Sequence, residues 1–213
     1  ETPGLPSGWT LVDNTVSNNP GLTYSNVTGH DGIGGDLGSA GHIGGNLTIA
    51  TNETAGAWFQ PSDVLSASNA FSVSVDVRID HEGSLDDAKL LLGDLDGGGP
   101  WVEINLPADG AAVNSDVYYV SNQVSGAKAK LIERYAYTAF SNDKWYVAEI
   151  IWTPQNGTTG ELKMVVRDPS GVEDSRGFMA LNLEMPVNVQ VGFGTGNDQA
   201  SFDNVSIISL IEA

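Results

Sequence analysis

Apolar and polar side chains alternate one by one through the middle of the chain. The clearest run is 71–80, where apolar residues hold the odd positions and polar residues hold the even ones. A period of two places the apolar side chains on one face of a β-strand and the polar ones on the other. The run therefore predicts a half-buried antiparallel strand.

Further strand-like runs follow at intervals, separated by turns rich in Asp, Asn, Gly and Pro. They span 89–92, 101–106, 117–120, 130–137, 145–152, 161–167, 187–193 and 200–208. One short helical turn is expected at 62–67. Many short strands without an internal repeat predict an all-β fold, a two-sheet antiparallel β-sandwich of the jelly-roll kind. We expect one domain over residues 1–213, with a Gly-rich loop at about 29–46.

Three stretches of the chain resemble the concanavalin A-like and laminin-G-like jelly rolls of bacterial carbohydrate-binding modules and polysaccharide lyases. They are WYVAEIIW at 145–152, GELKMVVRDPSG at 160–171 and ASFDNVSI at 200–207. These motifs mark strands and turns, so the resemblance implies a fold and a class of ligand without defining a catalytic centre. By the same resemblance, Trp145 and Trp152 are expected in the core.

The composition narrows the class of partner. The 27 acidic and 9 basic side chains give a net charge of −18, which disfavours nucleic acid and anionic membranes because phosphate binding needs Lys and Arg. The sequence has no cysteine and shows no run long and apolar enough to span a membrane. We expect a secreted or cell-surface bacterial protein, already without its signal peptide, that is monomeric and has other domains of a larger secreted enzyme among its candidate partners.

One segment runs against the overall charge. Four cations and two acids give residues 117–148 a net charge of +2, which leaves −20 for the rest of the chain. Cations attract the carboxylates of an anionic glycan, and aromatic rings stack on the apolar faces of sugars. The ligand-binding candidates are Trp101, Tyr118, Lys128, Lys130, Arg134, Tyr135 and Tyr137, with Trp58 and Tyr119 as further aromatic platforms. The alternative is that these residues form the solvated face of ordinary strands.

A second interpretation of this segment is catalytic. A polysaccharide lyase needs a base, a group that neutralises the uronate carboxylate and a proton donor for the leaving oxygen. The candidates for these roles are Tyr135, Tyr137, Lys130 and His42. The paired glutamates of glycoside hydrolases are missing, since Glu103 and Glu149 each stand alone in their strands. The usual strand motifs of alginate lyases are also missing.

Calcium is the expected cofactor, in a structural role. Asp94 and Asp96 present two carboxylates beside a glycine turn, which suits a hard cation that prefers oxygen ligands. The resemblance further implies a calcium ligand at Asp203 in the tripeptide Phe-Asp-Asn. The alternative for the first pair is an ordinary Asp-rich turn.

Three functions remain open from the sequence. The first is an extracellular carbohydrate-binding module or lectin-like domain that binds a polysaccharide. The second is a polysaccharide lyase that cleaves a uronate glycan by β-elimination. The third is a structural or adhesive surface domain without a glycan ligand.

Overall fold

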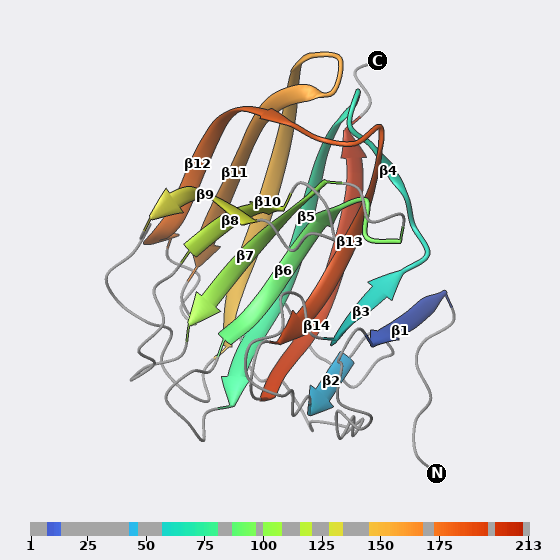
Figure 1. Ribbon diagram of the computed structural model, residues 1–213. Helices are drawn as coiled ribbons and strands as arrows, with labels where there is room; N and C mark the ends of the chain where they lie inside the picture. The colour runs from blue at the N-terminus through green and yellow to red at the C-terminus, as the bar shows by residue number, and fades with distance from the viewer. Residues whose placement is uncertain are drawn as a thin grey trace.

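The computed structural model describes the chain over residues 8–13, 43–46, 57–80, 87–96, 100–107, 116–120, 128–133, 145–167, 173–195 and 199–210. Within these ranges the regular structure is entirely β-strand, arranged as two antiparallel sheets that lie face to face (Figure 1). No helix that could span a membrane occurs in the described part of the chain. The expected two-sheet antiparallel sandwich is confirmed.

The front sheet is the one nearer the viewer in Figure 1. Its strands follow the spatial order β1 (Trp9–Asp13), β3 (Ala57–Pro61), β13 (Asn188–Thr195), β6 (Asp87–Gly93), β7 (Trp101–Pro107), β8 (Asp116–Val120) and β9 (Lys128–Glu133). A short strand, β4 (Leu65–Ser66), also pairs with β13.

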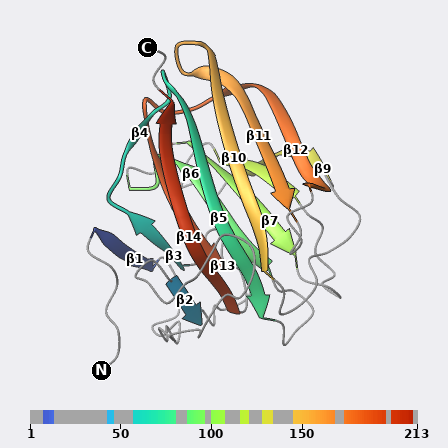
Figure 2. The same ribbon diagram turned by 180° about the vertical axis from the view of Figure 1, so that it is seen from behind.

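The back sheet faces the viewer in Figure 2. Its strands follow the order β12 (Glu173–Glu184), β11 (Thr159–Arg167), β10 (Trp145–Asn156), β5 (Ala70–Asp80), β14 (Gln199–Leu210) and β2 (Ile43–Asn46). Strand β10 pairs with β5 in continuous register from Trp145 opposite Arg78 to Trp152 opposite Phe71.

The core lies between the two sheets and follows from the alternation along each strand. The odd positions of β5 from Phe71 to Val77 and the even positions of β6, of β7 and of β10 up to Trp152 belong to it. Trp152 is fully buried there, stacks on Phe71 with ring centroids 6.3 Å apart, and donates from Nε1 to the Ala67 carbonyl at 2.8 Å. Gly160 is required beside it, because a Cβ there would lie 2.9 Å from the indole and 2.3 Å from the Thr153 carbonyl.

Each of the nine predicted strands overlaps a strand of the structure, although 134–137 lies outside the described residues. The helical turn expected at 62–67 is wrong. Leu65 instead begins β4, because its side chain is buried in the core, and the Ala67 amide donates to the Val187 carbonyl.

The core position expected for Trp145 is also wrong. Trp145 and Trp152 are seven residues apart on one strand, an odd separation that puts their side chains on opposite faces of the sheet. Trp145 is accordingly half-buried outside the core, with the Arg78 guanidinium 5.6 Å from its ring centroid. The core position expected for Trp152 is confirmed.

Candidate functional site

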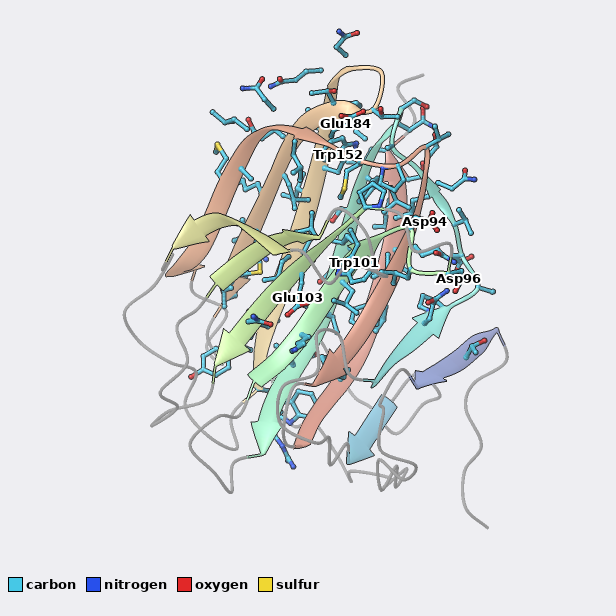
Figure 3. All side chains as sticks on the ribbon, viewed as in Figure 1. Asp94, Asp96, Trp101, Glu103, Trp152 and Glu184 are labelled. Carbon is cyan, nitrogen blue, oxygen red and sulfur yellow. The ribbon has the colours of Figure 1, made fainter. Side chains whose placement is uncertain are left out.

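The front sheet carries polar side chains on the face that points away from the core, which we call the outer face. On β7 the core receives Val102, Ile104 and Leu106, so the odd positions belong to the outer face. These odd positions include Asn105 and also Trp101 and Glu103, which are labelled in Figure 3. In an antiparallel sheet that packs on the core with one face, the polar side chains of the other face normally lie in water. Here Glu103 is 0% exposed and Asn105 is 5% exposed, so the outer face buries polar groups.

A charged pair occupies the middle of the outer face. The Lys89 ammonium on β6 lies 3.4 Å from the Glu103 carboxylate on β7. Their side chains are 7% and 0% exposed. Taking two charges out of water costs several kcal/mol per ion, roughly what their attraction returns, so packing alone does not favour such a pair over two apolar side chains. A buried ion pair at this place is better explained by a use for the two charges.

The register extends the outer face toward the edge strands β8 and β9. Directly paired residues of an antiparallel ladder share one face. Tyr118 pairs with both Glu103 and Lys130, and Val120 pairs with both Trp101 and Lys128. Of the predicted ligand-binding residues, Trp101, Tyr118, Lys128 and Lys130 thus hold positions on one face of one sheet.

Not every predicted aromatic residue shares that face. Tyr119 pairs with Val102, a core residue, so its register position falls on the opposite side of the sheet. Trp58 pairs with Gly194, which in turn pairs with Lys89, so Trp58 belongs to the outer face. His42, Arg134, Tyr135 and Tyr137 lie outside the described residues.

Glycines interrupt the outer face beside the charged pair. Gly192 and Gly194 of β13 pair with Leu91 and Lys89 of β6. A glycine in the interior of a strand weakens the sheet and often marks a place where a ligand or another backbone approaches closely. Both glycines are buried, so the face has buried backbone without side chains on one side of the ion pair and side chains on the other.

Trp101 closes one end of the outer face. It pairs with Gly93, whose φ of +149° suits glycine, and a Cβ on Gly93 would lie 2.4 Å from the Pro100 carbonyl and 2.6 Å from the Trp101 Cβ. Trp101 is 1% exposed, so it is not the exposed stacking platform that the sequence predicts. Its buried indole Nε1 makes no hydrogen bond to the described part of the chain.

The predicted calcium pair belongs to the loop between β6 and β7. Asp96 is exposed, and its Oδ1 and Oδ2 accept hydrogen bonds from the side-chain amides of Gln60 and Gln190. Asp203 stands in the other sheet, on β14, opposite Asp76. Among the described residues, no three His, Cys, Asp or Glu side chains gather as a metal-binding set. Both Asp96 carboxylate oxygens thus have amide donors, and the calcium role expected for Asp94 and Asp96 stays a prediction.

The back sheet presents a different outer face. Arg167 and Glu149 form an ion pair of 3.0 Å there, and their side chains are 36% and 27% exposed. Ser72 donates to the same carboxylate at 3.3 Å. Half-exposed pairs of this kind are typical of solvated strands.

The pair that sequence reasoning missed is Lys89 with Glu103. In the sequence, Glu103 stands out only as an isolated carboxylate, which is unsuited to glycoside hydrolysis. A usable signal was present: Glu103 and Asn105 are polar at successive odd positions of a strand whose even positions are apolar. The partner could not be found without the register of β6 against β7, which puts Lys89 opposite Asn105 and diagonal to Glu103.

Comparisons with known proteins place the fold. No protein-family model matches the chain, and no curated protein matches it significantly. Among solved structures, it is similar to a marine PL-14 alginate lyase from Aplysia kurodai, with a TM-score of 0.58 and 16% identity over 89% of this chain and 87% of that one. It is also similar to the carbohydrate-binding module CBM66 from Bacillus subtilis, with a TM-score of 0.54 and 17% identity over 96% and 99% of the two chains.

A third similar structure is the exoplasmic/lumenal domain of VIP36 in its Ca²⁺/Man3GlcNAc-bound form, with a TM-score of 0.58 and 9% identity over 97% of this chain and 85% of that one. Identities this low establish the fold and nothing further. Together with the two antiparallel sheets, these likenesses show that the chain folds as a concanavalin A-like β-sandwich.

Proposed function

We propose that the chain is an extracellular carbohydrate-binding domain, and that its polysaccharide ligand lies along the outer face of the front sheet. The observation that carries this proposal is the buried Lys89–Glu103 pair on a sheet face that is not part of the core. The fold supports it, because the three similar structures are an alginate lyase, a carbohydrate-binding module and a domain bound to Man3GlcNAc.

The residues of the outer face suit recognition of a sugar. Ligand sites combine apolar surroundings with a few well-placed polar groups that set orientation and specificity. Lys89, Glu103 and Asn105 bring a donor, an acceptor and an amide to this face beside the apolar Leu91 and Trp101. All five are at most about 7% exposed, so we expect them to shape the site from beneath. Because the charged pair holds its geometry before any ligand arrives, little ordering is needed on binding.

A polysaccharide lyase is the second candidate, favoured by the register at Tyr118. This residue stands between Glu103 and Lys130 on neighbouring strands, so a proton donor, a carboxylate and a cation hold adjacent positions. Proton transfer and neutralisation of a uronate carboxylate need such groups. The set predicted from the sequence, namely Lys130, Tyr135, Tyr137 and His42, remains the catalytic hypothesis for this alternative. A structural or adhesive domain without a glycan ligand is the third candidate.

Calcium remains a proposal, with Asp94, Asp96 and Asp203 as its expected ligands. Asp203 offers a direct test, and its register position lies opposite the buried Asp76. A structural ion there predicts a higher melting temperature in calcium than in EDTA. The difference should disappear in Asp203→Asn, and equal melting temperatures for the wild-type protein would remove the proposal.

The test of function is a panel of neutral and anionic polysaccharides mixed with the purified protein. Retention in affinity gels measures binding, and ultraviolet absorbance of a conjugated uronate measures β-elimination. Retention without a rise in absorbance supports the binding domain, and a rise in absorbance replaces it with the lyase. No retention and no absorbance change on any polysaccharide would favour the structural domain.

A further inference from the structure

Three side chains tie the β6–β7 loop to β13, the strand beside β6, and to β3, the next strand of the front sheet. We call Gln60 of β3, Gln190 of β13 and Asp96 of the loop the amide clamp. Gln60 Nε2 donates to Asp96 Oδ1 at 3.2 Å, and Gln190 Nε2 donates to Asp96 Oδ2. Gln190 Oε1 in turn accepts from the backbone amides of Leu95 at 2.8 Å and of Asp96 at 3.2 Å. The loop is therefore held through both a side chain and its backbone.

The backbone donors settle which end of the Gln190 amide faces Asp96. Side-chain amide oxygen and nitrogen are assigned from their hydrogen-bond partners. Two backbone N–H groups require an oxygen at the end that faces them, which leaves the NH₂ group for the carboxylate. Asp96 thus meets the NH₂ groups of both glutamines, one at each carboxylate oxygen.

The clamp acts on the end of the outer face. The loop leaves β6 at Gly93, and the Asp94 amide donates to the Pro100 carbonyl at 3.0 Å, immediately before Trp101. Gly93 and Trp101 are register partners in van der Waals contact, so a shift of the loop moves the indole. Residues 94–96 of the loop and the Trp101 end of the proposed ligand face are therefore expected to move together.

We infer that the amide clamp positions residues 94–96 of the β6–β7 loop, and with them the Trp101 end of the ligand face, without needing a calcium ion. Each Asp96 carboxylate oxygen accepts a hydrogen bond from a glutamine amide, so the carboxylate has partners in the protein itself. If Gln190 turned its oxygen to the ion, the amides of Leu95 and Asp96 would lose their acceptor. The effect on ligand affinity rests on the proposed function, whereas the effect on the loop does not.

Amide hydrogen exchange of the full chain tests the clamp directly. In Gln190→Ala, the amides of Leu95 and Asp96 should exchange about tenfold faster than in the wild-type protein, since their acceptor is gone. Asp96→Asn is the conservative variant, and the same acceleration is expected because its NH₂ group would face one of the two glutamine NH₂ groups, donor against donor. The exposed Gln155 supplies the control, Gln155→Ala, which should leave both amides unchanged.

Calcium and glycan binding complete the test. Exchange at Leu95 and Asp96 should be the same in calcium and in EDTA, and slower exchange in calcium would overturn the inference. Unchanged exchange in Gln190→Ala would overturn it equally. On a polysaccharide that the wild-type protein retains, Gln190→Ala should bind about tenfold more weakly than Gln155→Ala. If the wild-type protein retains none, the proposed function fails while the exchange data still decide on the clamp.

Discussion

Replacing Lys89 by Met should strongly destabilise the protein. The Glu103 carboxylate has no exposed surface and lies 3.4 Å from the Lys89 ammonium, so the substitution takes an opposite charge away from a buried carboxylate. Breaking a buried pair in this way costs about 3–5 kcal/mol of the free energy of unfolding. The measurement is urea denaturation followed by tryptophan fluorescence and by circular dichroism. As a matched control, Lys163→Met on the half-buried β11 position should change the same quantity by no more than about 0.5 kcal/mol.

The double variant Lys89→Met/Glu103→Leu separates stability from function. Removing both charges together avoids an isolated buried ion, so its stability should return to within about 1 kcal/mol of the wild-type protein or exceed it. The same variant should lose glycan retention, because it lacks the charged groups of the proposed ligand face. The buried-pair reasoning would be refuted if Lys89→Met lowered the free energy of unfolding by less than about 1 kcal/mol. It would also be refuted if the double variant lost as much stability as Lys89→Met and Glu103→Leu lose separately, added together.

Four further substitutions test the fold. Trp152→Phe should cost about 1–3 kcal/mol in urea denaturation, because a buried carbonyl loses its hydrogen-bond donor. Gly93→Ala should cost more stability than Gly157→Ala in the same assay. Both positions have positive φ, which costs a non-glycine residue about 1–3 kcal/mol, but only a Cβ at Gly93 would also collide with neighbouring atoms. Equal costs would contradict this close packing. Arg167→Ala should cost at most about 1 kcal/mol, falling as salt is added, since its ion pair is partly exposed.

The sandwich could be predicted because its central strands alternate cleanly. Strand β5 alternates over its whole length, and the match between apolar positions and the core is complete at Val73, Val75 and Val77. Strand β12 was missed because its pairing with β11 shifts register between Gly160 and Leu162 and again between Met164 and Val166. A bulge inserts a residue and breaks the period of two, so the alternation that signals a strand is lost.

The site could be predicted only in part, because it depends on pairing between strands. Tyr118, Lys128 and Lys130 were chosen from local charge and aromatic content, and the register then placed them on one face. The sequence of β6 does not show which of its side chains face the core. Leu90, Leu91 and Leu92 are consecutive and all buried, although only Leu90 and Leu92 join the core between the sheets. Composition alone cannot tell which face such a strand turns to the core.

Tryptophan indole signals test the location of the ligand face most directly. The chain has five tryptophans, of which Trp101 is on the outer face of the front sheet and Trp145 is outside the core on the back sheet. Proton–nitrogen spectra, assigned with Trp101→Phe and Trp145→Phe, would be recorded while an oligosaccharide from a retained polysaccharide is added. The proposed face predicts that the Trp101 signal shifts in proportion to saturation and that the Trp145 signal stays in place. A shift of Trp145 with Trp101 unmoved would put the ligand on the back sheet and contradict the proposal.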